Sequence, residues 1–126
     1  MSRHFVTCEP WDVVVVPFPF TDSPVSKRRP ALVLSSRAFN SGSGHSLMAQ
    51  ITTAKHSSWP GDIAIKNIEA GLPEACIVRL KLFTIDNRLI QRRTGTLESS
   101  DRERVLSGLR LLMGALNLEN SLAPGP

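Results

Sequence analysis

The sequence predicts a small, mainly β domain: a strongly bent antiparallel sheet, or open barrel, closed by a C-terminal helix. Short apolar segments separated by polar turns occupy most of the chain, and helical periodicity appears only after Ser100. The length of 126 residues corresponds to one domain of ordinary size. We therefore expect a single domain over residues 1–126, with its core at about 11–116 and loose ends at 1–9 and 117–126.

The first strand is expected within Trp11–Phe20, where four consecutive valines favour a pleated strand buried on both faces. Pro17 and Pro19 cannot donate to a ladder, so the strand should end or lie at an edge there. Turn-rich composition predicts loops at Thr21–Arg29 and Arg37–His45. Further strands are expected at Pro30–Ser35, Leu47–Thr53, Asp62–Lys66, Ala75–Arg79 (or as far as Leu82) and Leu89–Leu97.

The C-terminal segment has the pattern of an amphipathic helix. Ser100 and Glu103 have the spacing of a capping box, which predicts the start of the helix. Apolar residues then recur with a period of 3.6, so a helix of about four turns should pack one stripe on the sheet. The stripe consists of Val105, Leu106, Leu109, Leu112, Met113 and Leu116.

Charge is the first indication of function. Fifteen Lys and Arg face eleven Asp and Glu, which gives a net charge of +4, and eleven of the cations are Arg. A small Arg-rich domain indicates a polyanionic partner such as nucleic acid. No apolar run approaches the ~20 residues of a membrane span and no secretory signal is visible, so we expect a cytoplasmic protein with no membrane contact. Cys8 and Cys76 should be free thiols.

Sequence motifs exclude several kinds of site. The chain has no phosphate-binding Gly loop, no nucleophile elbow and no zinc-protease motif, and its carboxylates are scattered. We therefore expect no metal and no cofactor. The remaining polar residues suit phosphodiester chemistry: Arg29 is held extended by Pro30, Thr52 ends a strand, and Arg79 lies between apolar residues. Taken singly, each also fits a plain structural role.

Several segments together resemble the PemK/MazF family of toxins. They are Trp11–Asp22, Lys27–Ser35, Ala49–Thr52, Val78–Asp86 and Gly95–Leu97 with the helix that follows, so the resemblance covers about Trp11–Leu116. It implies an SH3-like barrel of the CcdB/PemK type with a C-terminal helix, which usually forms a homodimer. It also implies a cognate antitoxin, with DNA contacted only through the antitoxin complex.

The resemblance implies a sequence-specific endoribonuclease that cuts single-stranded RNA without metal. In this chemistry the ribose 2′-hydroxyl attacks phosphorus and leaves a 2′,3′-cyclic phosphate and a 5′-hydroxyl. The family's catalytic Arg, Thr and second Arg correspond to Arg29, Thr52 and Arg79. Phe20 and Trp59 are candidate base-stacking residues, although packing is an equal role for Phe20. The RNA-binding residues are predicted to be Phe20, Ser26, Lys27, Arg28, Thr53, Lys55, His56 and Trp59.

Two positions depart from the family pattern. Many members have Gly where this chain has Trp11, and some have Asp where it has Lys81. If that Asp accepts a proton, another group must do so here, and His45 and His56 are candidates. Two alternatives of the same fold are a non-catalytic nucleic-acid-binding barrel and a gyrase-inhibiting toxin, although the tail Leu122–Pro126 lacks the anchors expected of the latter.

Overall fold

The computed structural model describes residues 8–19, 27–53 and 57–117. These residues form one curled six-stranded antiparallel sheet in the order β4-β5-β3-β2-β1-β6. The strands are β1 (Asp12–Phe18), β2 (Lys27–Val33), β3 (His45–Thr52), β4 (Ile63–Ile65), β5 (Cys76–Asp86) and β6 (Arg92–Thr96). The helices are α1 (Arg37–Ser43), η1 (Asn87–Leu89), α2 (Ser99–Leu112) and η2 (Gly114–Asn117).

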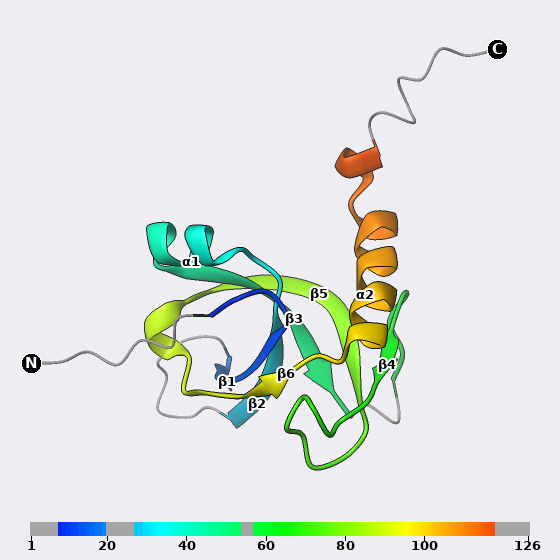
Figure 1. The fold of residues 1–126 in the computed structure, drawn as a ribbon, viewed down its shortest axis with the longest axis horizontal. Helices are drawn as coiled ribbons and strands as arrows, with labels where there is room; N and C mark the ends of the chain where they lie inside the picture. The colour runs from blue at the N-terminus through cyan, green and yellow to red at the C-terminus, as the bar shows by residue number, and fades with distance from the viewer. Residues whose placement is uncertain (1–7, 20–26, 54–56, 118–126) are drawn as a thin grey trace, which may run out of the picture.

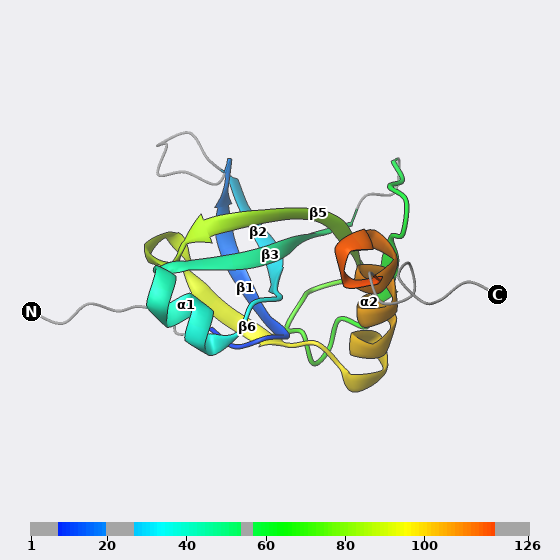
Figure 2. The ribbon, with the colours of Figure 1, turned by 90° about the horizontal axis from the view of Figure 1, so that it is seen from above.

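The architecture confirms the predicted class, a bent antiparallel sheet with a C-terminal helix. The two longer helices lie at opposite ends of β5, with α1 near its carboxyl end and α2 near its start (Figure 1 and Figure 2). The end of α2 and the following η2 extend away from the sheet (Figure 1). No helix in the described part of the chain is long and apolar enough to cross a membrane.

Strand β1 is buried on both faces, as its valine run predicts. Val13 and Leu32 are opposite each other in the β1–β2 pair, and β6 covers the other side of β1 from Asp12 to Val15. Val13 is fully buried in a first apolar cluster on one face of the sheet, and Val14 is fully buried in a second apolar cluster on the other face. Pro17 lies beyond the β6 pairing, so its missing N–H removes no bond on that side.

The first apolar cluster packs the sheet against α2, and the second lies on the opposite face. Because successive side chains of a strand alternate between faces, neighbouring residues of β2 belong to different clusters. Leu32 lies in the first cluster, whereas Ala31 and Val33 lie in the second. This alternation sends Arg28 and Arg29 to opposite faces.

Several predicted boundaries were wrong. The basic residues before Pro30 belong to β2 rather than to a loop, β5 continues to Asp86, and β6 starts only at Arg92. The segment expected to be a loop at Arg37–His45 contains α1. The Ser36 hydroxyl accepts a bond from the Phe39 amide at its start, and Gly44 ends it with a φ of 73°.

Helix α2 forms where predicted, but its start and its packing differ. Glu98, not Ser100, occupies the N-cap position, and the helix begins at Ser99 without a side-chain cap. The expected capping box is therefore absent. Instead the buried Asp101 carboxylate accepts a bond from the Lys66 amide at the end of β4 (2.8 Å), and it also pairs with Arg104. The bond from Lys66 attaches the first turn of α2 to the sheet.

Only two residues of the predicted apolar stripe pack on the sheet. Val105 is fully buried, and Leu109 is partly buried against the same cluster. The remaining stripe residues, Leu106, Leu112, Met113 and Leu116, are exposed. The stripe was predicted to pack along its whole length, but α2 runs past the end of the sheet and its last turns have nothing to cover.

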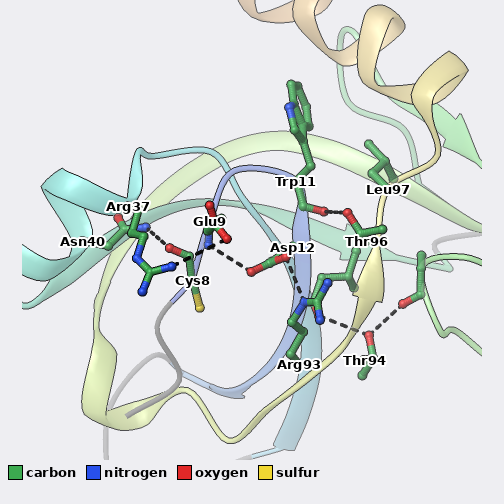
Figure 3. Close-up of polar contacts among 12 residues, drawn as sticks. Cys8, Glu9, Trp11, Asp12, Arg37, Asn40, Arg93, Thr94, Thr96 and Leu97 are labelled. Carbon is green, nitrogen blue, oxygen red and sulfur yellow. Dashed lines mark hydrogen bonds and ion pairs between the residues drawn. The ribbon is translucent and has the colours of Figure 1, made fainter.

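Trp11 adopts a left-handed backbone conformation, with a φ of 77°. Its amide donates to the Val33 carbonyl (2.9 Å), and its own carbonyl accepts bonds from the Leu97 amide (2.9 Å) and the Thr96 hydroxyl (3.2 Å; Figure 3). Glycine adopts this conformation without steric cost. This explains why glycine suits this position, and Trp11 adds a large ring that packs against the first apolar cluster.

The residues before Trp11 are held more firmly than a loose end. Cys8 is buried, and its carbonyl accepts a bond from the Asn40 amide group (3.0 Å). The Glu9 amide donates to Asp12, whose carboxylate also pairs with Arg93 (2.9 Å; Figure 3). The expectation of a loose segment is therefore wrong for residues 8 and 9. Cys8 and Cys76 are both buried thiols that form no disulfide, as expected.

Candidate functional site

The strand register places the three predicted catalytic residues on one face of the sheet. Ala31 is opposite Gln50 in the β2–β3 pair, and Arg29 and Thr52 each lie two residues further along their strands, on the same face as that pair. Gln50 is in turn opposite Arg79 in the β3–β5 pair. Residues two apart in a strand share a face. Arg29 of β2 and Arg79 of β5 therefore flank the end of β3, where Thr52 lies.

These residues line one cavity of about 190 Å³. Pro30 and Ile51 contribute to its wall, and two phenylalanines, Phe18 and Phe83, add aromatic surface. The polar residues that line it are Arg29, Arg79, Gln50 and Thr52. No carboxylate belongs to this lining, so the cavity favours an anionic or neutral ligand.

Arg79 is buried and held in place by Asp62, which directly precedes β4. Its Nε and Nη2 donate to the two carboxylate oxygens of Asp62 at 3.1 and 2.8 Å. Nη1 and Nη2 also donate to the hydroxyl and carbonyl oxygens of Ser57, both at 3.2 Å. A guanidinium has five N–H donors, so one donor on Nη1 remains for a ligand.

This pairing changes the ionisation of both partners. Hydrogen bonding to Arg79 lowers the pKa of the Asp62 carboxyl, and the Trp59 amide, which donates to the same carboxylate at 3.0 Å, adds to the effect. The same pairing raises the pKa of Arg79. Asp62 therefore stays ionised near neutral pH, and much of the charge of Arg79 is compensated within the protein.

Arg29 differs from Arg79 in its surroundings. It is exposed, and within the described residues no hydrogen bond or ion pair is formed by its guanidinium, which lies 5.2 Å from the centroid of the Phe18 ring. An aromatic face attracts a guanidinium without consuming its in-plane N–H donors. Arg29 is thus oriented toward the cavity while its charge remains available to an anion.

A second cavity, of about 260 Å³, adjoins the first and shares Arg29 and Pro30 with it. Arg28 and Arg92 contribute its cationic groups, and Thr53 contributes a hydroxyl. The rest of the lining comes from Val15, Thr94, Cys76 and the turn from Gly71 to Glu74. Arg28 and Thr53, which the sequence predicted as RNA-binding rather than catalytic residues, both line this neighbouring cavity.

Trp59 lies outside both linings, on the segment that Asp62 fixes. Its ring is 40% exposed, and the Lys81 ammonium lies 4.4 Å from the ring centroid. Lys81, found where some relatives have an acid, is therefore engaged with an aromatic ring. Lys27 is exposed at the start of β2, outside both linings.

His45 does not belong to this site. It begins β3, whereas Thr52 ends it, so the two are separated by about 24 Å along the strand. The suggestion of His45 as a proton acceptor is therefore wrong. The other predicted RNA-binding residues, Phe20, Ser26, Lys55 and His56, lie outside the described residues.

The structure adds residues that the sequence analysis did not single out. Gln50 lies two residues from Thr52, so the two side chains share a face of the strand. This period of two could have predicted Gln50 as a residue of the site. Asp62 and Ser57 had no such signal, because they reach Arg79 only through the fold. Among the described residues, no group of three or more His, Cys, Asp or Glu gathers in a way that would hold a metal ion.

Comparison with solved structures places this fold among bacterial toxins. An endoribonuclease from a mycobacterial species, solved with its cognate antitoxin, superposes with a TM-score of 0.67 at 15% identity, covering 95% of this chain and 98% of that one. A MazE–MazF complex from Deinococcus radiodurans gives 0.69 at 20% identity, covering 86% and 98%. The Mycobacterium tuberculosis toxin MazF-mt6 gives 0.63 at 18% identity, covering 78% and 91%.

At these identities the superpositions establish the fold, while the sequence itself establishes the family. No curated protein matches the chain significantly. Residues 9–113, however, match the family described as PemK-like, MazF-like toxin of type II toxin-antitoxin systems. That range contains every described residue of both cavities. The chain therefore belongs to the PemK-like, MazF-like family of type II toxin–antitoxin toxins.

Proposed function

We propose that this toxin is a sequence-specific endoribonuclease that cuts single-stranded RNA without a metal ion. The observation that carries the proposal is the contrast within the first cavity: Arg29 has no carboxylate partner among the described residues, whereas Arg79 is anchored by Asp62. One uncompensated charge and one anchored donor, with the hydroxyl of Thr52 on the strand between them, suit a phosphate whose charge increases during reaction.

The reaction is an internal transesterification. The ribose 2′-oxygen forms a bond to phosphorus, the bond from phosphorus to the 5′-oxygen breaks, and the products carry a 2′,3′-cyclic phosphate and a 5′-hydroxyl. A base removes the 2′-hydroxyl proton, and the leaving 5′-oxygen gains one. Arg29 stabilises the charge on the phosphorane, and the Thr52 hydroxyl donates to a non-bridging oxygen.

Arg79 acts mainly by position. Its guanidinium is held in place by the two bonds to Asp62 and the two to Ser57, which leave one N–H for a ligand. A donor fixed before substrate binds needs no rearrangement in the transition state. His56 remains the candidate proton acceptor, and a guanidinium is a poor one because its pKa is above ~12.

The bases flanking the cut are read outside the cavity. Trp59 offers an exposed ring and Lys81 a cation beside it, a combination that stacks a splayed base and attracts its phosphate. Phe20, Ser26, Lys27, Lys55 and His56 complete the proposed RNA-binding residues.

We further propose that the toxin works in the cytoplasm as a homodimer and is inhibited by a cognate antitoxin. An acidic antitoxin segment would bind the same cationic cavities as RNA and so exclude the substrate. Two of the similar solved structures are toxin–antitoxin complexes. DNA would be contacted only through the antitoxin complex.

The test is incubation of the purified protein with a long single-stranded RNA in excess EDTA, followed by mapping of the cut ends. We expect discrete cuts with cyclic phosphate ends, reduced at least 100-fold in Arg29→Ala. Arg37→Ala removes an equally exposed charge on α1 and serves as the control. Equal cutting by Arg29→Ala and wild type would contradict the assigned role, and RNA binding without cutting would favour a non-catalytic barrel.

A further inference from the structure

The described arginines divide into two groups. Six form hydrogen bonds or ion pairs with other protein groups, and Arg110 also has a partner within the protein; the six are Arg37, Arg79, Arg88, Arg93, Arg102 and Arg104. Among the residues that the structure describes, Arg28, Arg29 and Arg92 form no hydrogen bond or ion pair. All three are exposed, and all three line the second cavity.

The strand register explains why Arg28 and Arg92 converge. Arg92 of β6 is opposite Val15 of β1, which is opposite Pro30 of β2. Opposed side chains share a face, and Arg28 lies two residues from Pro30, so both arginines project from the same face. Two strand spacings and two residues separate their Cα atoms by about 12 Å. Long side chains from both can approach the cavity between them.

The second cavity continues from the first. Arg29 and Pro30 form part of both linings. A ligand that extends from the first cavity into the second therefore passes Arg29 on the way to Arg28. Thr53 follows Thr52 and lines the second cavity, just as Thr52 lines the first. Each cavity thus combines arginine with a threonine, and the second also includes Glu74 in its lining.

We propose that the second cavity is a phosphate subsite, in which Arg28 and Arg92 bind the backbone of a nucleotide next to the cleaved link. This inference rests on the proposed function, because it takes the ligand of the first cavity to be RNA. A continuous polyanion fits better than an isolated anion, since Arg29 joins the sites. Apolar surface from Val15 and Leu72 lies beside the arginines and accommodates the sugar or base.

The test measures binding, so it does not depend on cleavage. A short, fluorescein-labelled single-stranded RNA with 2′-O-methyl groups cannot be cut, and its anisotropy is titrated at several salt concentrations. We expect Arg92→Ala to bind about tenfold more weakly near 0.1 M salt. The slope of the logarithm of the binding constant against the logarithm of the salt concentration should be smaller in magnitude by about 0.7. Arg28→Ala should behave alike, and Arg92→Lys should retain most of the slope.

The control is Arg37→Ala, which removes the same charge from an exposed position on α1. If Arg37→Ala and Arg92→Ala change the affinity and slope equally, the effect is general charge and the subsite is refuted. Unchanged RNA binding by the Arg28→Ala/Arg92→Ala variant, together with lost binding of a labelled polyglutamate peptide, would also refute it in favour of an acidic protein segment.

Failure of this inference is distinguishable from failure of the proposed function. A wild-type protein that binds the uncut RNA with the expected Arg92-dependent slope, but leaves unmodified RNA intact, refutes the nuclease and supports the subsite. Specific cutting by the wild type, combined with a normal slope in Arg92→Ala, refutes the subsite and supports the nuclease. Unchanged circular dichroism and Tm in each variant show that folding is not responsible.

Discussion

Asp62 shows how one carboxylate organises a site that residue types alone did not reveal. Its two oxygens accept hydrogen bonds from Arg79, and one of them also accepts a bond from the Trp59 amide. Asp62 therefore links the first cavity to the exposed Trp59. We expect Asp62→Asn to lower Tm by several degrees and to reduce kcat more than KM, because Arg79 loses its anchor. Asp86→Asn, which breaks a surface pair with Arg88 at the far end of β5, is the matched control. A KM effect alone would contradict the positioning role.

The same carboxylate predicts how stability depends on pH. Its pKa is lowered in the folded protein, so the unfolded chain takes up the proton first on acidification. The stabilisation is present above the ordinary pKa of about 3.8 and is lost as the pH falls toward the folded value. Pairing with Arg88 lowers the pKa of Asp86 to about 2 and adds a similar effect. Urea unfolding from pH 6 to pH 3 should therefore show a shallower loss in Asp62→Asn, and parallel curves would contradict this.

Trp11 combines a backbone conformation that suits glycine with a side chain that packs. Trp11→Ala loses the ring and keeps the left-handed strain, whereas Trp11→Gly loses the ring and relieves the strain. We expect both to be less stable than wild type, with Trp11→Gly about 1 kcal/mol more stable than Trp11→Ala. Denaturant unfolding measures the difference. Equal or reversed stabilities would mean that the hydrogen bonds of Trp11 do not enforce its φ angle.

At the scale of elements, local sequence patterns predicted the strands. They failed where contacts between residues distant in the sequence determine the structure. The valines of β1 and the periodicity of α2 are local signals, and both elements formed. Helix α1 was missed because its composition resembles a turn, and Asn40 fixes it through bonds to Cys8 and from Asn87. Arg29 and Thr52 were found through strand position and resemblance, whereas the partner of Arg79 lies 17 residues away and depends on the β4–β5 pairing.

Helix α2 provides a prediction that separates its two halves. Val105 is fully buried against the sheet, while Leu111 is 85% exposed. Val105→Ala should destabilise the protein by about 2 kcal/mol, and Leu111→Ala by less than about 0.5 kcal/mol. Urea unfolding at low protein concentration tests both. A large, concentration-dependent loss for Leu111→Ala would instead show that another chain covers the exposed half of the helix.

At the scale of the whole molecule, the apolar clusters and the described strand arginines without ion pairs occupy different parts of the sheet. The apolar clusters fill both faces near the middle of the strands, and half of the described arginines form ion pairs with carboxylates. Positive charge without a partner collects where β2 begins and β3 ends, beside both cavities. Because these residues lie at strand ends and are exposed, substitutions there should change ligand binding with little change in stability.

The two thiols report whether this sheet unfolds as one unit. Cys8 lies in one apolar cluster and Cys76 in the other, and burial raises the pKa of Cys8 to about 11 and also raises that of Cys76. Only the thiolate reacts with iodoacetamide, so at pH 8 both thiols should be protected in the native protein and be alkylated together as it unfolds. Mass spectrometry across a urea series should show chains carrying no label or two. A large population labelled only at Cys8 would show that the N-terminal segment detaches from the sheet before the sheet itself unfolds.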